Sequence, residues 1–123
     1  MSSRQTTTRT GQQAETTAEN YLVAQGLKVI TRNFRCRFGE IDLIAIEHNT
    51  LVFVEVRYRR TLQHMAVIET LDKSKIQRLI TTGEYFLGHN RQYQKLQCRF
   101  DFIGISGNSQ KPEIEWIKNA FQA

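Results

Sequence analysis

Two carboxylates that lie inside apolar runs mark where this chain could do chemistry. Asp42 interrupts the apolar residues 41–46, and Glu55 interrupts residues 51–56. An ionised carboxylate in apolar surroundings is costly unless a cation pairs with it. Because side chains alternate along a strand, Glu55 and Arg57 share one face, which sets a guanidinium beside a carboxylate. The pattern predicts a polar site carried by two strands.

The short polar segment at residues 48–50 predicts that these strands form an antiparallel hairpin with a loop of two or four residues. If Glu47 pairs with Thr50, Asp42 falls opposite Glu55, with Cβ atoms about 4.5–5.5 Å apart. A slip of one residue would put the two carboxylates on opposite faces. A close pair is tolerable when Mg²⁺ or Mn²⁺ lies between the two groups. The first register therefore predicts a metal site.

Length and charge limit what the chain can be. Its 123 residues suffice for one domain with a core and are too few for two. The net charge of +5 predicts an anionic partner, nucleic acid before membrane, because no amphipathic basic helix or apolar span is visible. An ordinary basic surface is the alternative.

Cysteine use and the start of the chain indicate the compartment. Cys36 and Cys98 stand alone, without the spacing of a zinc site or a disulfide framework, which favours the reducing cytoplasm. Residues 1–10 lack the apolar core of a signal peptide. We predict a disordered tail at residues 1–10 and a single domain over residues 11–123.

Periodicity predicts the elements that must position the carboxylates. Helices are expected over residues 12–25, ended by Gly26, and after a cap at Asp72. Strands are expected at residues 27–32, 96–105 and 114–117, with a basic loop at 33–38 and a helical stub at 118–121. The hairpin has an apolar set on each face: Ile44, Ile46, Leu51 and Phe53 beside the carboxylates, and Ile41, Leu43, Val52, Val54 and Val56 opposite. One helix per face gives a three-layer α/β fold with a mixed central sheet.

Other polar residues admit a functional and an ordinary interpretation. Glu15 could face the sheet or be an exposed helical charge, and Lys75 could lean toward the hairpin or toward solvent. Arg35 and Arg37 could border the site and contact phosphate, or belong to a solvated loop. His64 could carry a proton, although a lone loop histidine usually does no chemistry.

Several blocks of the sequence resemble the YraN family of small bacterial proteins. The resemblance covers nearly the whole chain after the tail, and its most specific parts are the two strand blocks taken together. The matching residues are Gly11, Glu15, Ala18, Tyr21, Leu22, Gly26, Gly39-Glu40-Ile41-Asp42-Leu43-Ile44, Val52-Phe53-Val54-Glu55-Val56-Arg57-Tyr58-Arg59, Lys75 and Cys98-Arg99-Phe100-Asp101.

That family is similar to restriction-endonuclease-like nucleases of the PD-(D/E)XK type, including archaeal Holliday-junction resolvases. The resemblance implies an α-β-β-β-α-β core, metal ligands at Glu15, Asp42 and Glu55, and the basic residue of the second helix at Lys75. Arg57 stands where such nucleases carry a lysine. An arginine stays cationic, but its planar fork suits a different geometry, so reduced activity is expected.

The leading hypothesis is an endonuclease that uses Mg²⁺ or Mn²⁺ to hydrolyse phosphodiester bonds of DNA, including branched or structured DNA. Its catalytic residues would be Asp42, Glu55, Arg57 and Lys75, and its nucleic-acid-binding residues Arg35, Arg37, Arg59 and Arg60. DNA is favoured over RNA, no membrane contact is expected, and a homodimer would supply one cut per strand. The alternatives are a binding module of the same fold without turnover, and a structural set of ion pairs.

Overall fold

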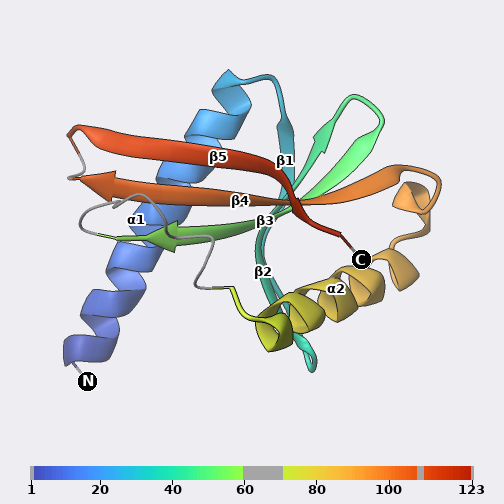
Figure 1. Cartoon of the computed structure of the whole chain (residues 1–123), viewed down its shortest axis with the longest axis horizontal. Helices are drawn as coiled ribbons and strands as arrows, with labels where there is room; N and C mark the ends of the chain where they lie inside the picture. Colours follow the sequence, from blue (N-terminus) through green and yellow to red (C-terminus); the bar gives the residue numbers. More distant parts are fainter. Residues whose placement is uncertain (1, 60–70, 108–109, 123) are drawn as a thin grey trace.

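The computed structural model describes residues 2–59, 71–107 and 110–122, with side chains from residue 11 onward. Within these residues, two helices, a short 3₁₀ turn and five strands follow one another along the chain (Figure 1). They are α1 (Ser2–Ala24), β1 (Lys28–Cys36), β2 (Gly39–Glu47), β3 (Thr50–Tyr58), α2 (Lys73–Gly88), η2 (Arg91–Tyr93), β4 (Gln97–Gly107) and β5 (Pro112–Phe121).

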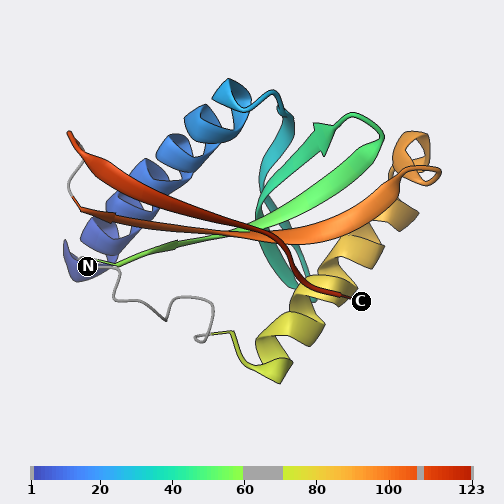
Figure 2. The same ribbon diagram turned by 45° about the horizontal axis from the view of Figure 1, so that its top comes forward.

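The strands form one sheet in the order β1-β2-β3-β4-β5. Neighbouring strands are antiparallel except β3 and β4, which are parallel. Helix α1 covers one face and α2 the other, so the two helices lie on opposite sides of the sheet in both views (Figures 1 and 2). The prediction of a mixed α/β fold with one helix per face is confirmed.

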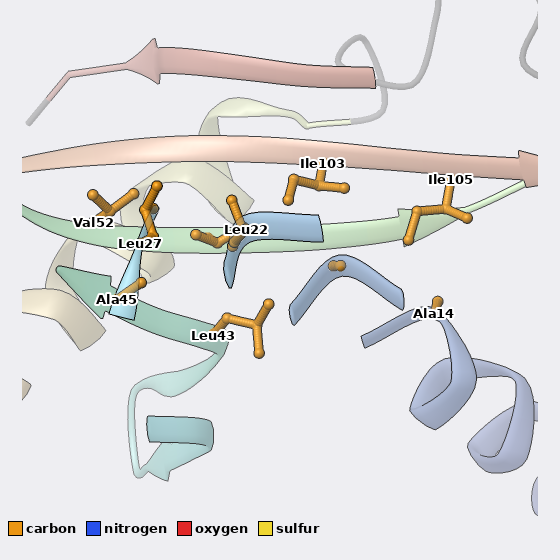
Figure 3. Packing of buried hydrophobic residues seen from close by; sticks show 10 residues of the cluster. Ala14, Leu22, Leu27, Leu43, Ala45, Val52, Ile103 and Ile105 are labelled. Atoms are coloured by element: carbon orange, nitrogen blue, oxygen red, sulfur yellow. The ribbon is translucent and has the colours of Figure 1, made fainter. Parts of the chain in front are cut away.

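The hairpin formed by β2 and β3 has the register that brings the carboxylates together. Glu47 pairs with Thr50, and the ladder continues to the pair Leu43 and Val54. The two apolar faces of the hairpin feed separate cores, of which Figure 3 shows the one beneath α1. Its buried residues are Ala14, Ala18, Leu22, Leu27, Leu43, Ala45, Val52, Val54, Ile103 and Ile105.

The predicted stop signal of the first helix and the predicted cap of the second helix are both confirmed. Helix α1 ends at Ala24, and Gly26 has φ +98°, a left-handed conformation that glycine adopts without a Cβ clash. Asp72 caps α2, since its Oδ1 accepts a hydrogen bond from the Lys75 backbone N–H at 2.8 Å. The α2-side core receives Leu79, Ile80 and Phe86, among others.

Three expectations about the ends of elements are wrong. Residues 33–36 continue β1 instead of starting a loop, because they pair with residues 39–41 of β2. Residues 118–121 continue β5, because Phe121 pairs with Phe100 of β4. The first helix begins at Ser2 and not at residue 12, where the periodic pattern begins.

The sheet bends where β1 and β2 pass Asp42. Leu43 belongs to the core beneath α1, whereas Ile41, two residues away, belongs to the core beneath α2. Side chains two apart on a regular strand share a face, so alternation is broken between them. On β1, Asn33 lies between the residues paired with Leu43 and Ile41 and has φ +56°, a region that Asn tolerates well. The expectation that Ile41 shares a face with Leu43 was therefore wrong.

Candidate functional site

The bend leaves Asp42 at the point where β2 and β3 stop pairing. The ladder ends at Leu43 and Val54, so the Val56 backbone N–H has no ladder acceptor on β2. The Oδ2 atom of Asp42 accepts that donor at 2.8 Å. The carboxyl group thus replaces a backbone carbonyl as the acceptor where β2 and β3 separate. This hydrogen bond fixes it beside Glu55.

Asp42 and Glu55 form a close pair of acids, of which Glu55 is buried and Asp42 is half-buried. The Glu55 side chain is buried, and the two carboxyl groups are close enough for a hydrogen bond between them. Burial and the negative charge of Glu55 raise the pKa of Asp42 from 3.8 to about 8, against the Val56 hydrogen bond, which lowers it. At neutral pH, without a cation, Asp42 therefore carries a proton.

Glu15 approaches the pair from helix α1. Its negative charge also raises the pKa of Asp42, so the two side chains act on each other electrostatically. Among the described residues, the Glu15 Oε1 atom is the buried side-chain oxygen without a hydrogen-bond partner. The Arg32 guanidinium Nε forms an ion pair with it at 3.6 Å, which is too long for a hydrogen bond. A buried acceptor without a hydrogen bond lowers the stability of the fold. A ligand that brings hydrogen-bond donors or a positive charge would satisfy it.

Two cationic side chains lie against Glu55. The Arg57 Nε donates to the Glu55 Oε2 at 3.0 Å, as the strand spacing predicts. The Lys75 Nζ reaches the same oxygen at 3.6 Å from the first turn of α2. Both cations are about a third exposed, which leaves their outer sides open to a substrate.

The ligand chemistry of these acids suits a divalent cation, but their side chains do not form a complete coordination shell. In residues 2–59, 71–107 and 110–122, no group of three or more His, Cys, Asp or Glu side chains has metal-site geometry. Asp42 and Glu55 nevertheless offer hard oxygen ligands, and Glu15 offers a third through its unsatisfied atom. Mg²⁺ commonly keeps several waters and takes only one or two protein carboxylates. The pair matches that ligand set, and Glu15 would add a third carboxylate.

The predicted nucleic-acid-binding arginines lie in different places. Arg35 is exposed and pairs with Glu40 at 2.9 Å near the β1–β2 turn, and Arg37 lies in that turn with its Cζ 4.8 Å from the centre of the Phe38 ring. Arg59 is exposed just after β3. Arg60 and His64 lie outside the described residues.

A second buried carboxylate was not singled out from the sequence. Asp101 of β4 is fully buried and accepts hydrogen bonds from Arg99, Trp116 and the Asn119 backbone N–H. Arg99 also pairs with Glu47 at 2.8 Å. Every carboxylate oxygen of Asp101 is satisfied, which indicates a structural network. The signal that revealed Asp42 and Glu55, an acid within an apolar run, was also present here.

Comparison with known proteins places the chain among relatives of similar length. A family model described as "Uncharacterised protein family UPF0102" matches residues 14–105. A UPF0102 protein of Coxiella burnetii is 46% identical over 116 residues, which cover 94% of each chain. One of Saccharophagus degradans is 44% identical over 112 residues, covering 91% of this chain and 92% of the relative. One of Alcanivorax borkumensis is 42% identical over 113 residues, covering 91% and 90%.

The length and the hydropathy of the helices bear on whether they could cross a membrane. Within the described part of the chain, neither helix combines the length and apolar character needed to cross a membrane.

Proposed function

The chain belongs to the uncharacterised protein family UPF0102, and we propose that it is a metal-dependent nuclease that hydrolyses phosphodiester bonds of DNA. The observation that carries the proposal is the pair Asp42 and Glu55. A fold gains nothing in stability from burying two acids against each other, because one must hold a proton to avoid repulsion. Such a strained pair is typical of a functional site.

The order of elements supports the same proposal. A helix, three antiparallel strands, a second helix and a parallel fourth strand form the core, with the acids on the second and third strands. We infer that this core is the restriction-endonuclease-like fold that the sequence blocks imply.

Each side chain of the site has a role in the proposed reaction. Asp42 and Glu55 would hold Mg²⁺ or Mn²⁺, with Glu15 reaching it directly or through water. The cation, when bound, would withdraw charge from the scissile phosphate and acidify the attacking water. Lys75 presents an ammonium that can stabilise negative charge developing on the phosphate, and Arg57 neutralises Glu55 and can donate to a phosphate oxygen.

One observation favours a second candidate, a nucleic-acid-binding module without turnover. Arg57 holds Glu55 through its Nε at 3.0 Å, so the guanidinium already occupies one oxygen of a proposed metal ligand. If that pairing persists when a substrate binds, Glu55 would have only its Oε1 atom left for a cation. The protein would then bind nucleic acid through its basic side chains alone.

The proposal is tested by incubating the protein with linear, single-stranded, flapped and four-way-junction DNA, and matching RNA, in Mg²⁺ and Mn²⁺. We expect cleavage of at least one substrate that stops when a chelator removes the cation. If every substrate is bound and left intact, the binding module is the correct account. The same panel compares DNA with RNA, and light scattering of the complexes tests the homodimer.

Arg57→Lys should raise the cleavage rate about tenfold. A lysine has no planar guanidinium to hold the Glu55 carboxylate, so the carboxylate is freer to bind the cation. Its ammonium is also the compact positive charge that the resembling nucleases carry at this position. Single-turnover cleavage of the best substrate measures the effect. Equal or lower rates in Arg57→Lys would show that arginine is not what limits turnover.

Replacing Arg35 and Arg37 together with Ala should weaken binding to DNA and reduce its salt dependence. Each phosphate contact contributes about one to the slope of log affinity against log salt, so the slope should fall by about two. Anisotropy titrations at several salt concentrations measure it. Lys118→Ala is the matched control, because Lys118 is exposed on β5. An unchanged slope in the double variant would show that these arginines do not contact phosphate.

A further inference from the structure

An exposed edge of helix α2 carries basic and aromatic side chains in one line. Lys75, Arg78, Tyr85 and His89 follow one another at spacings of three, seven and four residues, which place them on a single stripe of the helix. The β1–β2 turn lies beside this helix in both views (Figures 1 and 2). It adds two more side chains to the stripe. We call the whole set the α2 track: Arg37, Phe38, Lys75, Arg78, Tyr85 and His89.

The aromatic members of the α2 track touch one another, and the ring centre of Tyr85 also lies 6.3 Å from that of Phe34, which packs against the core beneath α2. Phe38 and Tyr85 have ring centres 5.9 Å apart, and Tyr85 stacks on His89 at 4.2 Å. Arg37 lies over the outer ring at 4.8 Å. Phe38 is 37% exposed, and neither it nor Tyr85 belongs to the described core clusters. Phe38 therefore adds little to core packing and is open at the surface, whereas Tyr85 is half-buried.

The α2 track begins at the candidate nuclease site. Lys75 lies 3.6 Å from Glu55 and also lines a cavity of about 190 Å³ together with Gly39, Glu40, Arg78 and Leu79. That cavity is smaller than ordinary small-molecule pockets. It lies between helix α2 and the first residues of β2, Gly39 and Glu40, which follow Phe38 in the chain. A Cβ at Gly39 would lie 3.1 Å from the Thr82 Oγ1, so the turn is packed closely on α2 and Phe38 has a fixed position.

We propose that the α2 track stacks unpaired bases, and that the protein acts on nucleic acid with a single-stranded segment beside the scissile phosphate. This inference rests on the proposed nuclease function and names its substrate class. Exposed aromatic rings alternating with cations are the means by which proteins hold single strands. A duplex keeps its base faces stacked inside and offers nothing to Phe38. From Lys75 to His89 the helix rises about 21 Å, enough for several nucleotides.

The test measures binding of three probes to the full chain in a chelator, which prevents cleavage. The probes are a labelled oligothymidylate, an abasic oligonucleotide of equal length, and a blunt duplex. We expect Phe38→Ala and Phe38→Leu to weaken oligothymidylate binding about 5- to 100-fold, and Phe38→Tyr to bind like the wild type, because only tyrosine keeps a π face. The abasic strand should bind all four proteins equally. Lys118→Ala, which removes a cation–π pair with Trp116 outside the α2 track, should change nothing.

Each contrary outcome is distinct. If Phe38→Leu binds oligothymidylate as the wild type does, the ring serves packing and the inference is wrong. It is also wrong if the wild type binds the abasic strand as tightly as oligothymidylate, or binds neither. Cleavage is assayed separately in Mg²⁺: base-dependent binding without cleavage retains the α2 track and rejects the nuclease. Cleavage that is unaffected in Phe38→Ala, with unchanged binding, retains the nuclease and rejects the α2 track.

Discussion

Asp42→Asn should make the metal-free protein more stable at pH 8 while removing its nuclease activity. The pKa of Asp42 is raised to about 8 by burial and by Glu55. Between pH 3.8 and about 8 the folded state therefore binds more protons than the unfolded state, so wild-type stability falls as pH rises through this window. Asparagine has no such titration. We expect Asp42→Asn to gain roughly 2–5 kcal/mol at pH 8 and little near pH 4.

Urea unfolding of both proteins from pH 4 to pH 9, in a chelator, measures this difference. Cleavage should fall at least about 100-fold, since the amide preserves shape and removes a negative charge that the cation needs. A stability difference that does not change with pH would show that Asp42 does not titrate in this window. A variant that is less stable than the wild type at pH 8 would show that the carboxylate serves the fold.

Glu55→Gln should abolish cleavage to a similar degree but change stability in the opposite direction. Glu55 is the member of the pair that contacts cations, because Arg57 and Lys75 lie 3.0 and 3.6 Å from its Oε2. Glutamine leaves both cations without their partner, at a cost of about 1–3 kcal/mol. Both cations are partly exposed, and water limits the loss.

Urea unfolding at pH 7, next to the Asp42→Asn variant, measures the second effect. Glu47→Gln serves as a matched control, since Glu47 pairs with Arg99 far from the candidate site. If both site variants lose stability equally, the acids form a structural ion-pair set. If Glu55→Gln cleaves at the wild-type rate, Glu55 is not a metal ligand.

The parts of the fold that the sequence predicted are those governed by local chemistry. Gly26 ends α1 through its left-handed backbone, and Asp72 caps α2 through one side-chain hydrogen bond. The polar turn fixed the pairing of Glu47 with Thr50, and this register alone brought Asp42 toward Glu55. Each of these signals lies within a few residues of the structure that it determines.

The parts that could not be predicted depend on partners far along the chain. Residues 118–121 form a strand because β4 offers them backbone partners, and nothing local distinguishes them from a helix. The break in alternation at Asp42 lies opposite Asn33 of the neighbouring strand, which has a positive φ. Alternation alone predicted a face for Ile41 and could not detect the bend. The proximity of Glu15 depends on how α1 packs, which only its resemblance to related sequences suggested.

The claim on which the other proposals depend is that Asp42 and Glu55 hold a divalent cation. Calorimetric titration of Mn²⁺ into the protein at pH 7, repeated in buffers of different ionisation enthalpy, counts the protons released on binding. Because the pKa of Asp42 is about 8, we predict one saturable site that releases close to one proton per ion, and whose affinity rises toward pH 8. Asp42→Asn should lose the site. Absence of saturable binding, or binding that Asp42→Asn retains without any change in proton release, would contradict the account.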